Sequence, residues 1–430
     1  MNFIRVYNEF INESVYMGEH KSGLKVFVIP KEGFTKKYAI FGTKYGSIDR
    51  KFVPLGESDM ITVPDGIAHF LEHKMFEQPD GTDAFMEFSK YGANANAYTS
   101  FTNTCYLFAC TDNFYENFEH LLNFVQMPHF TDENVAKEQG IIGQEIRMYD
   151  DDPGWRVMFN LLGALYSDNP VKTDIAGTVE SIAQIDKDVL YKCYNTFYNP
   201  SNMAVCIAGD VDIDKIGDMV EKLILDRPSG KVIREEISEP TKVNKKLVEM
   251  NLDVSIPLFE IGFKDNEMLS GIDLYKKELA VSIILRIISG KSSRLFTDMY
   301  EEGLINEKFG SDFMMEEEFS CAMIEGESEN PIKVRERVEE YILEKLKTGI
   351  TEEEFNRAKK AQYGDFLRQF NDVEVIAGSF IRNVLKGINT FDYMTVYNEM
   401  NLEYVNKVFN EVFSLDNMAM SIVWPLKNQE

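Results

Sequence analysis

The chain has 430 residues with 45 basic and 71 acidic side chains, a formal charge of −26, and 44% apolar residues. The length allows two or three domains, and the apolar content suffices for folded cores, which excludes a largely disordered protein. The acidic excess excludes a nucleic-acid groove, because phosphates are neutralised by a surplus of Lys and Arg. A well-solvated surface is the simpler interpretation of this charge, and a basic partner is the alternative.

Neither disulfides nor a membrane anchor are expected. The five cysteines are odd in number and lack C-x-x-C spacing, which indicates small core residues. The first residues, MNFIRVYNEF, contain no apolar signal segment. The best apolar run, 279–288, is interrupted by Arg286 and is too short to span a bilayer. We therefore expect a cytoplasmic protein without membrane contact.

The first predicted elements are two strands. Residues 24–30 (LKVFVIP) alternate between apolar and polar types, and 38–47 (YAIFGTKYGS) follow a turn that contains Gly33. Their proximity in sequence predicts a β-hairpin. Long helical stretches and short strands follow, up to a strand at 203–209 (MAVCIAG).

The later part of the chain repeats this pattern. A charged stretch with Pro and Gly, 226–246, predicts a linker, and new strands are expected at 247–252 and 258–263. Two pairs of segments support a repeat: 131–152 resembles 351–372, and 202–207 resembles 417–422. We therefore predict an α+β fold of two tandem similar domains, each a mostly antiparallel sheet packed against helices. The expected ranges are 1–225 for the first domain, 226–246 for the linker and 247–430 for the similar second domain.

The most specific motif is the pentapeptide HFLEH, which contains His69, Glu72 and His73. Residues four apart share one face of a helix, so both imidazoles can bind one metal, with the Glu beside them. The order H-x-x-E-H is the inverzincin arrangement, in which two histidines and a distant carboxylate bind zinc. The alternative is a helix with two incidental histidines, and the rarity of the motif argues against it.

A third ligand is expected from the segment KEQGIIGQEIRMYDD. Glu138 and Glu145 are seven residues apart and therefore share a helix face. We predict Glu145 as the third zinc ligand and Glu138 as a group that orients a histidine or the water. Ordinary surface glutamates are the alternative. The repeat places Asp365 and Ala358 at the equivalent positions, and no histidine occurs beyond residue 129, so we expect one Zn²⁺ per chain, in the first domain.

These residues resemble the family of pitrilysin, insulin-degrading enzyme and mitochondrial processing peptidase. The resemblance rests on HFLEH, the paired glutamates, GANANAYTSFTNTCYLF at 92–108 and IAGTVESI at 175–182. It is greatest to bacterial zinc-peptidase subunits of this length, which are typically encoded beside a paralogue without the zinc motif. It implies a processing-peptidase or LuxS-like metallohydrolase fold.

The resemblance also implies roles for individual residues. His69, His73 and Glu145 would be the zinc ligands, and Glu72 the general base. The four residues Asn96, Ala97, Tyr98 and Thr99 would form the edge strand to which substrate adds as a further β-strand. Their mostly small side chains allow an extended peptide to approach closely. An ordinary sheet strand is the alternative interpretation.

One stretch departs from the family pattern. Members with a complete active site carry an Arg and, seven residues later, a Tyr in their second domain, in a segment resembling LREKRGLAY. Here the segment is SSRLFTDMYEEGLINEKF, and alignment on Gly303 and Leu304 puts Met299 and Asn306 at those positions. Arg294 and Tyr300 are only six residues apart and out of register. Either the alignment is shifted or a partner supplies the pair, and we favour the partner.

The sequence thus predicts a zinc-dependent endopeptidase for unfolded or extended peptides, such as leader or processing peptides. In this hypothesis Glu72 takes a proton from the attacking water and returns it to the leaving amine. The chain would be the catalytic subunit of a heterodimer with a paralogous subunit that lacks the zinc motif; a homodimer is the alternative. A different hypothesis is a non-catalytic scaffold or interaction subunit of the same family. The absence of phosphate-loop motifs argues against a nucleotide-driven machine.

Overall fold

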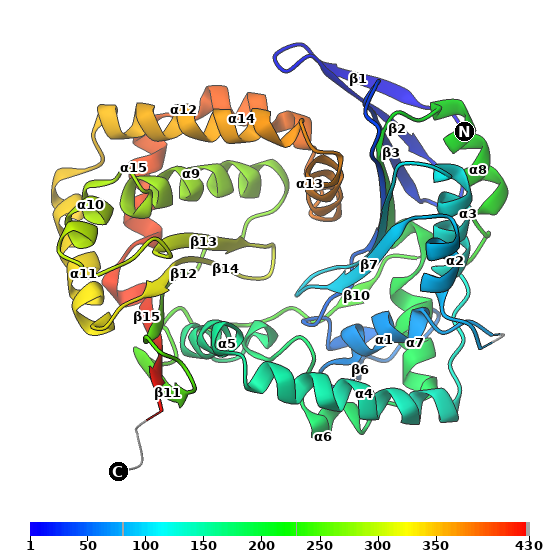
Figure 1. Cartoon of the computed structure of the whole chain (residues 1–430), viewed down its shortest axis with the longest axis horizontal. Coiled ribbons are helices and arrows are strands. Elements are labelled where there is room, and N and C mark those ends of the chain that lie inside the picture. Colours follow the sequence, from blue (N-terminus) through cyan, green and yellow to red (C-terminus); the bar gives the residue numbers. More distant parts are fainter. Residues whose placement is uncertain (80, 229, 427–430) are drawn as a thin grey trace. The chain divides into compact units, whose positions relative to one another are not determined.

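The computed structural model describes residues 1–79, 81–228 and 230–426. The chain divides into two compact units, each assembled from separate segments (Figure 1). Unit 1 comprises Met1–Ile146, Asp174–Glu236 and Leu367–Phe391. Unit 2 comprises Arg147–Thr173, Ile237–Phe366 and Asp392–Glu430.

The main sheet of unit 1 has seven strands in the order β1-β2-β3-β9-β4-β8-β7. The strands are β1 (Ile4–Asn8), β2 (Glu13–Glu19), β3 (Lys25–Pro30), β4 (Lys37–Thr43), β7 (Asn94–Thr99), β8 (Thr104–Cys110) and β9 (Met203–Gly209). All pairings are antiparallel except that of β3 with β9. A smaller sheet has the order β10-β5-β6, with β5 (Lys51–Val53), β6 (Ile61–Thr62) and β10 (Ile233–Arg234).

The expected hairpin of the first two predicted strands is wrong. Both strands form, as β3 and β4, but they do not pair with each other. The completely buried strand β9 lies between them, parallel to β3 and antiparallel to β4. The apolar sequence MAVCIAG suits a central strand that is covered on both faces.

Helices cover unit 1, and several begin with a side-chain cap. They are α1 (Ile67–Met75), α2 (Ala84–Lys90), α3 (Phe114–Phe124), α4 (Asp132–Asp150), α6 (Val179–Ile182), α7 (Lys187–Phe197), α8 (Ile213–Leu223) and α13 (Val373–Leu385), with the 3-10 turn η2 (Pro200–Asn202). In α8, for example, Asp212 accepts a hydrogen bond from the backbone N–H of Lys215, and Ile216 and Val220 are buried on one face. Helix α4 continues beyond unit 1 into Arg147.

The sheet of unit 2 has five strands in the order β11-β15-β12-β14-β13. Its strands are β11 (Leu247–Leu252), β12 (Leu258–Asp265), β13 (Gly310–Met315), β14 (Ser320–Glu327) and β15 (Met418–Pro425). Its helices are α5 (Pro153–Leu165), α9 (Gly271–Ser289), α10 (Arg294–Glu301), α11 (Pro331–Thr348), α12 (Glu352–Gln369), α14 (Tyr393–Glu399) and α15 (Leu402–Val412). Two short 3-10 turns also belong to unit 2, η1 (Pro170–Lys172) and η4 (Leu415–Asn417), and a third, η3 (Thr390–Asp392), begins in unit 1 and ends in unit 2.

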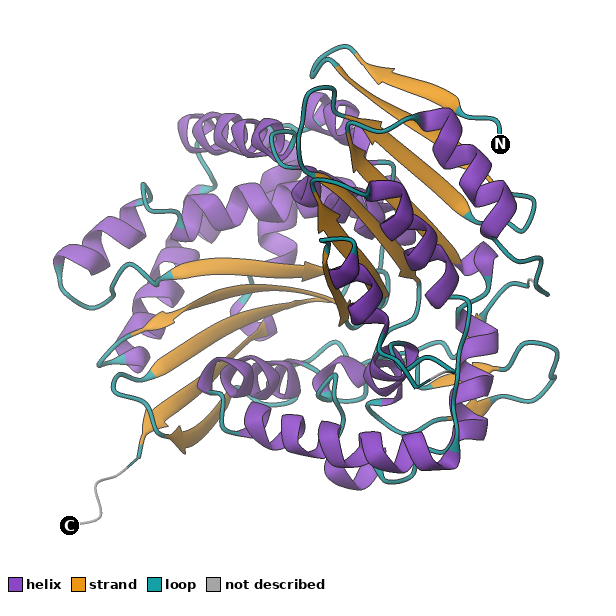
Figure 2. Cartoon of the chain, turned by 45° about the vertical axis from the view of Figure 1, so that its right-hand side comes forward, coloured by secondary structure: helices purple, strands orange, loops and turns teal. Residues whose placement is uncertain are grey.

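The predicted repeat is confirmed by the sheet topology. The strands β3-β9-β4-β8-β7 of unit 1 correspond in order to β11-β15-β12-β14-β13 of unit 2. The first pair in each series is parallel and the others are antiparallel. The predicted α+β fold with two similar sheet-and-helix domains is therefore present, and Figure 2 shows helices alongside the strands.

Each unit uses a helix from the other half of the chain. Helix α13 packs on β9 and β4 of unit 1, and α5 packs on β15 and β12 of unit 2. Gly42 allows one of these contacts, because a Cβ there would lie 3.1 Å from Ile381 and from Leu385. Gly262 is its counterpart, with Leu165 at 2.8 Å and Leu161 at 3.0 Å. We call α5 and α13 the exchanged helices. Each packs closely against a glycine of a central strand.

The units consequently differ from the contiguous ranges expected from the sequence. The apolar face of each sheet requires a cover, and the covering helix comes from outside the range that supplies the strands. The expected linker 226–246 is also partly built into the units. Its strand β10 pairs with β5, and Glu239 accepts a 2.6 Å hydrogen bond from Lys264.

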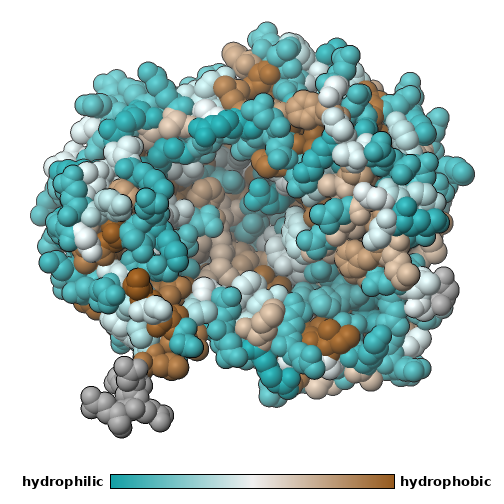
Figure 3. All heavy atoms as spheres, viewed as in Figure 1, coloured by the Kyte–Doolittle hydropathy of each residue, from teal (hydrophilic) through white to brown (hydrophobic). Residues whose placement is uncertain are grey.

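Hydrophilic side chains dominate the visible surface, and apolar side chains form scattered patches (Figure 3). All five cysteines are buried free thiols, as expected for core residues. None of the helices within the described ranges is both long and apolar enough to cross a membrane.

Candidate metal centre and active site

Helix α1 carries the HFLEH motif in the interior of unit 1. Gly66 precedes it with a φ of 85°, and a Cβ there would lie 2.3 Å from the carbonyl oxygen of Ala176. A glycine is therefore required where the chain turns into the helix. The helix holds the His69 and His73 rings side by side, with their centroids 4.6 Å apart.

Helix α4 adds a carboxylate to the two imidazoles. Glu145 lies 3.7 Å from Nε2 of His69 through Oε1, and 3.5 Å from Nε2 of His73 through Oε2. Within the described residues, this is the group whose three ligand atoms all lie within 4.8 Å of one another. Ligands on a tetrahedral zinc ion at about 2.0–2.1 Å are separated by about 3.4 Å. The donor set and its spacing fit a zinc ion.

The protonation state of His69 also suits metal binding. Burial, helped by the neighbouring His73, lowers the pKa of His69 to about 4, so this imidazole is neutral at neutral pH. Neutral imidazole is the form that binds a metal. Burial opposes protonation of His73 as well, but its hydrogen bond with Glu138 and the nearby Glu72 and Glu145 raise its pKa.

Glu138 contacts a histidine directly. Its Oε1 lies 3.1 Å from Nδ1 of His73, which leaves Nε2 of that ring directed at Glu145. A carboxylate on the far nitrogen selects the imidazole tautomer and holds the ring orientation. The structure thus brings together the four residues His69, His73, Glu138 and Glu145 that the sequence analysis singled out.

Lys74 belongs to the same group, and sequence reasoning missed it. Its side chain is completely buried, with Nζ 2.5 Å from Oε2 of Glu77 and 3.4 Å from Oε2 of Glu138. A lysine directly after the motif, three residues before a glutamate and within a mostly apolar helix, was the available signal. The sequence could not show that Glu138 would reach it from another helix.

Glu72 is buried beside these residues, and a hydroxyl group donates to it. Thr99 donates a hydrogen bond of 2.6 Å from Oγ1 to Oε2 of Glu72. Burial raises the pKa of Glu72 to about 7, although the Thr99 hydrogen bond lowers it. A carboxylate with such a pKa exchanges protons readily near neutral pH, as a general base requires.

A pocket of about 440 Å³ opens next to this carboxylate. Its lining includes Glu72, His73 and Glu138, together with Asn96 and Ala97 of β7. Strand β7 is the last strand of its sheet, so one of its edges is not paired within the sheet. The pocket therefore joins the candidate catalytic carboxylate to a strand edge.

The four residues of the expected substrate strand all lie in β7, Asn94–Thr99. Side chains alternate along a strand, so Ala97 and Thr99 share one face while Asn96 and Tyr98 share the other. The Thr99 face is the one that contacts Glu72. Oδ1 of Asn96 accepts a hydrogen bond of 2.9 Å from the backbone N–H of Ala97.

Comparisons with known proteins agree with this arrangement. Residues 62–179 match the family model described as insulinase (peptidase family M16), and residues 184–362 match that of the peptidase M16 inactive domain. The chain is 45% identical over 423 residues to the zinc protease YmfH of Bacillus subtilis, covering 97% of this chain and 98% of that protein.

Solved structures show the same fold. An M16-like peptidase from Alicyclobacillus acidocaldarius superimposes with a TM-score of 0.93 and 34% identity, over 98% of this chain and 100% of that one. Pitrilysin has a TM-score of 0.79 at 13% identity, and the match covers 99% of this chain and 46% of pitrilysin, so this likeness concerns the fold alone. Together with the two family models, these matches show that the chain is a member of the M16 family of insulinase- and pitrilysin-type peptidases.

Proposed function

We propose that the protein is a zinc-dependent endopeptidase that cleaves unfolded or extended peptides, including leader or processing peptides. The observation that carries the proposal is the convergence of His69, His73 and Glu145 beside the buried carboxylate of Glu72. One ion per chain would be held by these three side chains. When bound, zinc would supply a positive charge that acidifies a water molecule and polarises a carbonyl group.

The side chains of unit 1 would perform the remaining tasks. Glu72 would accept the proton of the attacking water and later donate it to the leaving amine, for which a pKa of about 7 is suitable. Thr99 would hold Glu72 in place, and Glu138 would hold His73. The edge of β7 from Asn96 to Thr99 would bind the peptide as an additional strand. Backbone pairing there would displace the Asn96 side chain from the Ala97 N–H.

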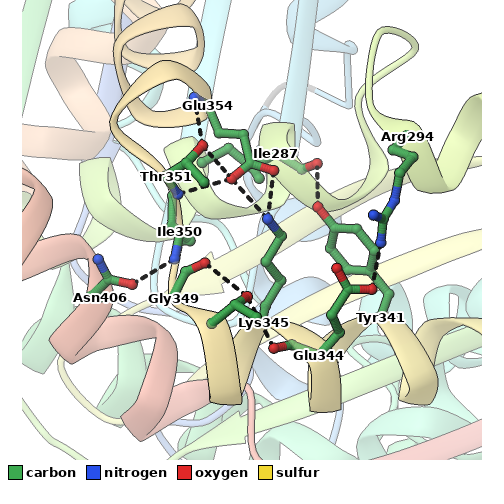
Figure 4. A network of polar contacts seen from close by, with 11 residues as sticks. Ile287, Arg294, Tyr341, Glu344, Lys345, Gly349, Ile350, Thr351, Glu354 and Asn406 are labelled. Carbon is green, nitrogen blue, oxygen red and sulfur yellow. Dashed lines mark hydrogen bonds and ion pairs between the residues drawn. The ribbon is translucent and has the colours of Figure 1, made fainter.

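We further propose that the chain is the catalytic subunit of a heterodimer. Met299, at the position of the expected Arg, is completely buried in α10. Asn306, at the position of the expected Tyr, donates a 3.0 Å hydrogen bond to Glu327. The neighbouring Arg294 donates to Glu344 at 2.6 Å (Figure 4). These contacts support a partner that supplies the Arg and Tyr, here a paralogous subunit without the zinc motif.

The catalytic proposal is tested with Glu72→Gln, which keeps the shape of the side chain and removes the base. The variant should bind one zinc per chain and lose peptide cleavage by at least about 100-fold, the scale of general base catalysis. Glu87→Gln, on the surface of α2, is the matched control and should cleave as the parent does. Cleavage by Glu72→Gln at the parental rate, with zinc retained, would show that Glu72 is not the general base. Absence of cleavage by the parent chain in every assembly would favour the scaffold hypothesis.

The heterodimer proposal requires a separate experiment. The purified chain is assayed against a peptide library alone and after mixing with its paralogue, and the mass of each species is measured by light scattering. Activity should require the mixture and coincide with the heterodimer. Full activity of the chain alone, as monomer or homodimer, would contradict the need for a partner.

A further inference from the structure

The pocket beside Glu72 is lined by a lysine, Lys137, for which the proposed catalysis has no use. Lys137 lies on α4 directly before Glu138, and its side chain is exposed. All residues that line this pocket belong to unit 1, so that unit alone defines it. The few polar groups of a pocket usually decide which ligand it takes. The role of Lys137 is therefore a question about the substrate.

Apolar side chains form the wall next to this lysine. The rings of Phe76 and Phe85 are stacked, with their centroids 4.2 Å apart and their planes 6° apart. Ile141, which is 46% exposed, follows Lys137 by one turn of α4, so the two side chains are neighbours on the helix surface. A side chain that enters the pocket thus meets apolar surface beside an ammonium group.

The acidic residues around the pocket already have partners. Oε2 of Glu77 lies 2.5 Å from Nζ of the buried Lys74, which also contacts Glu138. Oδ1 of Asp83 accepts a hydrogen bond of 2.8 Å from the backbone N–H of Phe85, at the start of α2. These contacts hold the acids within the protein and make them poor acceptors for a charged group of the substrate.

Lys137 differs from these residues because its charge is not paired. Within residues 1–79, 81–228 and 230–426, no side chain forms a hydrogen bond or an ion pair with it. Consecutive helix residues do not face each other, so the neighbouring Glu138 can contact His73 and Lys74 while Lys137 stays at the rim of the pocket. Its ammonium group is available to a carboxylate from outside the chain.

The edge of β7 gives a substrate side chain access to this pocket. Asn96 and Ala97 of that strand line the pocket together with Glu72. Side chains that lie on the same face of adjacent strands are neighbours. A peptide added to β7 would therefore place one side chain in the pocket next to Ala97. Because Glu72 lines the same pocket, that side chain would belong to a residue beside the bond that is cleaved.

We propose that the pocket takes an acidic side chain of the substrate, with Lys137 as its counter-charge. This inference rests on the proposed peptidase function and adds to it a preference for glutamate at a position adjacent to the cleaved bond. The carboxylate would accept a hydrogen bond from Lys137, and the two methylene groups would contact Phe76 and Ile141. Lys137 would determine specificity and would take no part in the cleavage step.

The experiment compares peptides that have the same shape but different charge. The zinc-loaded protein, with its partner subunit where activity requires one, cleaves a parent peptide whose cut site is located by mass spectrometry. Glutamate, glutamine or lysine is then placed on either side of that site. At one of the two positions, kcat/KM for the glutamate peptide should exceed that for the glutamine peptide by about two- to fivefold, the effect of an exposed ion pair. High salt should reduce this ratio.

Reversal of the charge at Lys137 provides the decisive comparison. In Lys137→Met the ratio of kcat/KM for the glutamate and glutamine peptides should fall to about one. In Lys137→Glu the ratio should invert, and the lysine peptide should become the best of the three, because the new carboxylate repels the acid and attracts the base. The ratio compares two substrates of one enzyme preparation, so a partly inactive preparation does not alter it.

The matched control is Lys222→Glu, an equal change of charge at an exposed lysine of α8 that does not line the pocket. It should keep the parental ratio. If Lys222→Glu changed the ratio as much as Lys137→Glu does, the net charge of the protein would be the cause and the inference would be wrong.

Equal cleavage of the glutamate and glutamine peptides by the parent, or a parental ratio in Lys137→Glu, would also overturn the inference. In both cases the peptides are still cut, so the proposed peptidase function would stand and only the role of Lys137 would fall. If no peptide were cleaved in any assembly, the proposed function would be wrong, and the inference that rests on it would be wrong as well.

Discussion

The ammonium group of Lys74 lies 3.4 Å from Oε2 of Glu138, while Oε1 of the same carboxylate lies 3.1 Å from Nδ1 of His73. One carboxylate thus joins a completely buried lysine to a candidate zinc ligand. Burial alone would raise the pKa of Glu138, but the His73 hydrogen bond and the Lys74 charge hold it below its ordinary value. An ionised Glu138 is the form that orients His73.

Replacement of Lys74 by Met should weaken zinc binding. The substitution keeps an unbranched side chain of similar length but removes the charge that favours ionised Glu138. Loss of such an outer-shell interaction typically costs 10- to 100-fold in metal affinity. Titration against a competing chelator measures the effect. Lys90→Met, on the exposed surface of α2, should bind zinc normally, and unchanged affinity in folded Lys74→Met would exclude the suggested role.

Replacement of Thr99 by Val should slow catalysis without loss of zinc. Valine has the same shape as threonine but cannot donate to Glu72. A hydrogen bond to a charged group is worth about 1.5–3 kcal/mol, so kcat/KM should fall by about 10- to 100-fold. Metal content should match the parent. Thr62→Val, on the exposed part of β6, should match the parent in every property. A normal rate would mean that packing alone positions Glu72.

Replacement of Gly262 by Val should destabilise unit 2. Its side chain would enter space that Leu161 and Leu165 of α5 already occupy, at about 3 Å from the position of Cβ. Overpacking of this kind lowers the free energy of unfolding by about 1–3 kcal/mol. Gly163→Ala is a control on α5 itself, because its added methyl group meets open space. That control should be neutral or should stabilise by up to about 1 kcal/mol. Denaturant unfolding measures both.

Glu260 should make the stability of unit 2 depend on pH. Its pKa of about 8 in the folded chain exceeds the ordinary value of 4.5, because burial and the charges of Glu325 and Asp312 favour the protonated form. The folded state therefore binds a proton that the unfolded state releases, and stability falls as the pH rises from about 4.5 to 8. Glu260→Gln has no such group and should be more stable than the parent at pH 8, by about 2–5 kcal/mol.

The two forms should converge near pH 4. Urea unfolding of both proteins across this range measures the difference, with Glu249→Gln as the control that follows the parent. A constant difference between pH 4 and 8 would show that folding does not raise the pKa of Glu260.

The candidate metal centre could be predicted well because its main signals are local. His69, Glu72 and His73 lie within one helical turn, and Glu138 and Glu145 within two, so helix periodicity alone places them on shared faces. What the sequence could not provide is the pairing between helices. The contact of Lys74 with Glu138 joins residues 64 positions apart. The Thr99 hydrogen bond to Glu72 likewise joins a strand to a helix.

The topology was harder to predict for the same reason. Strand β9 enters between β3 and β4 from about 170 residues away, and a parallel pairing of this kind leaves no local turn signal. The sequence likewise gives no signal for the exchange of α5 and α13, since an apolar helix face does not identify the sheet that it will cover. The repeat itself was visible, because it is a comparison of the chain with itself.

The exchanged helix α13 delays the folding of unit 1 during synthesis. During synthesis the strands of unit 1 leave the ribosome long before residues 373–385, which cover β9 and β4. The nascent first half therefore exposes an apolar sheet face until nearly nine-tenths of the chain has been made, a state that is prone to aggregation. Cutting the gene between its two repeats would leave each product without its covering helix. The halves are thus similar in architecture but cannot mature independently.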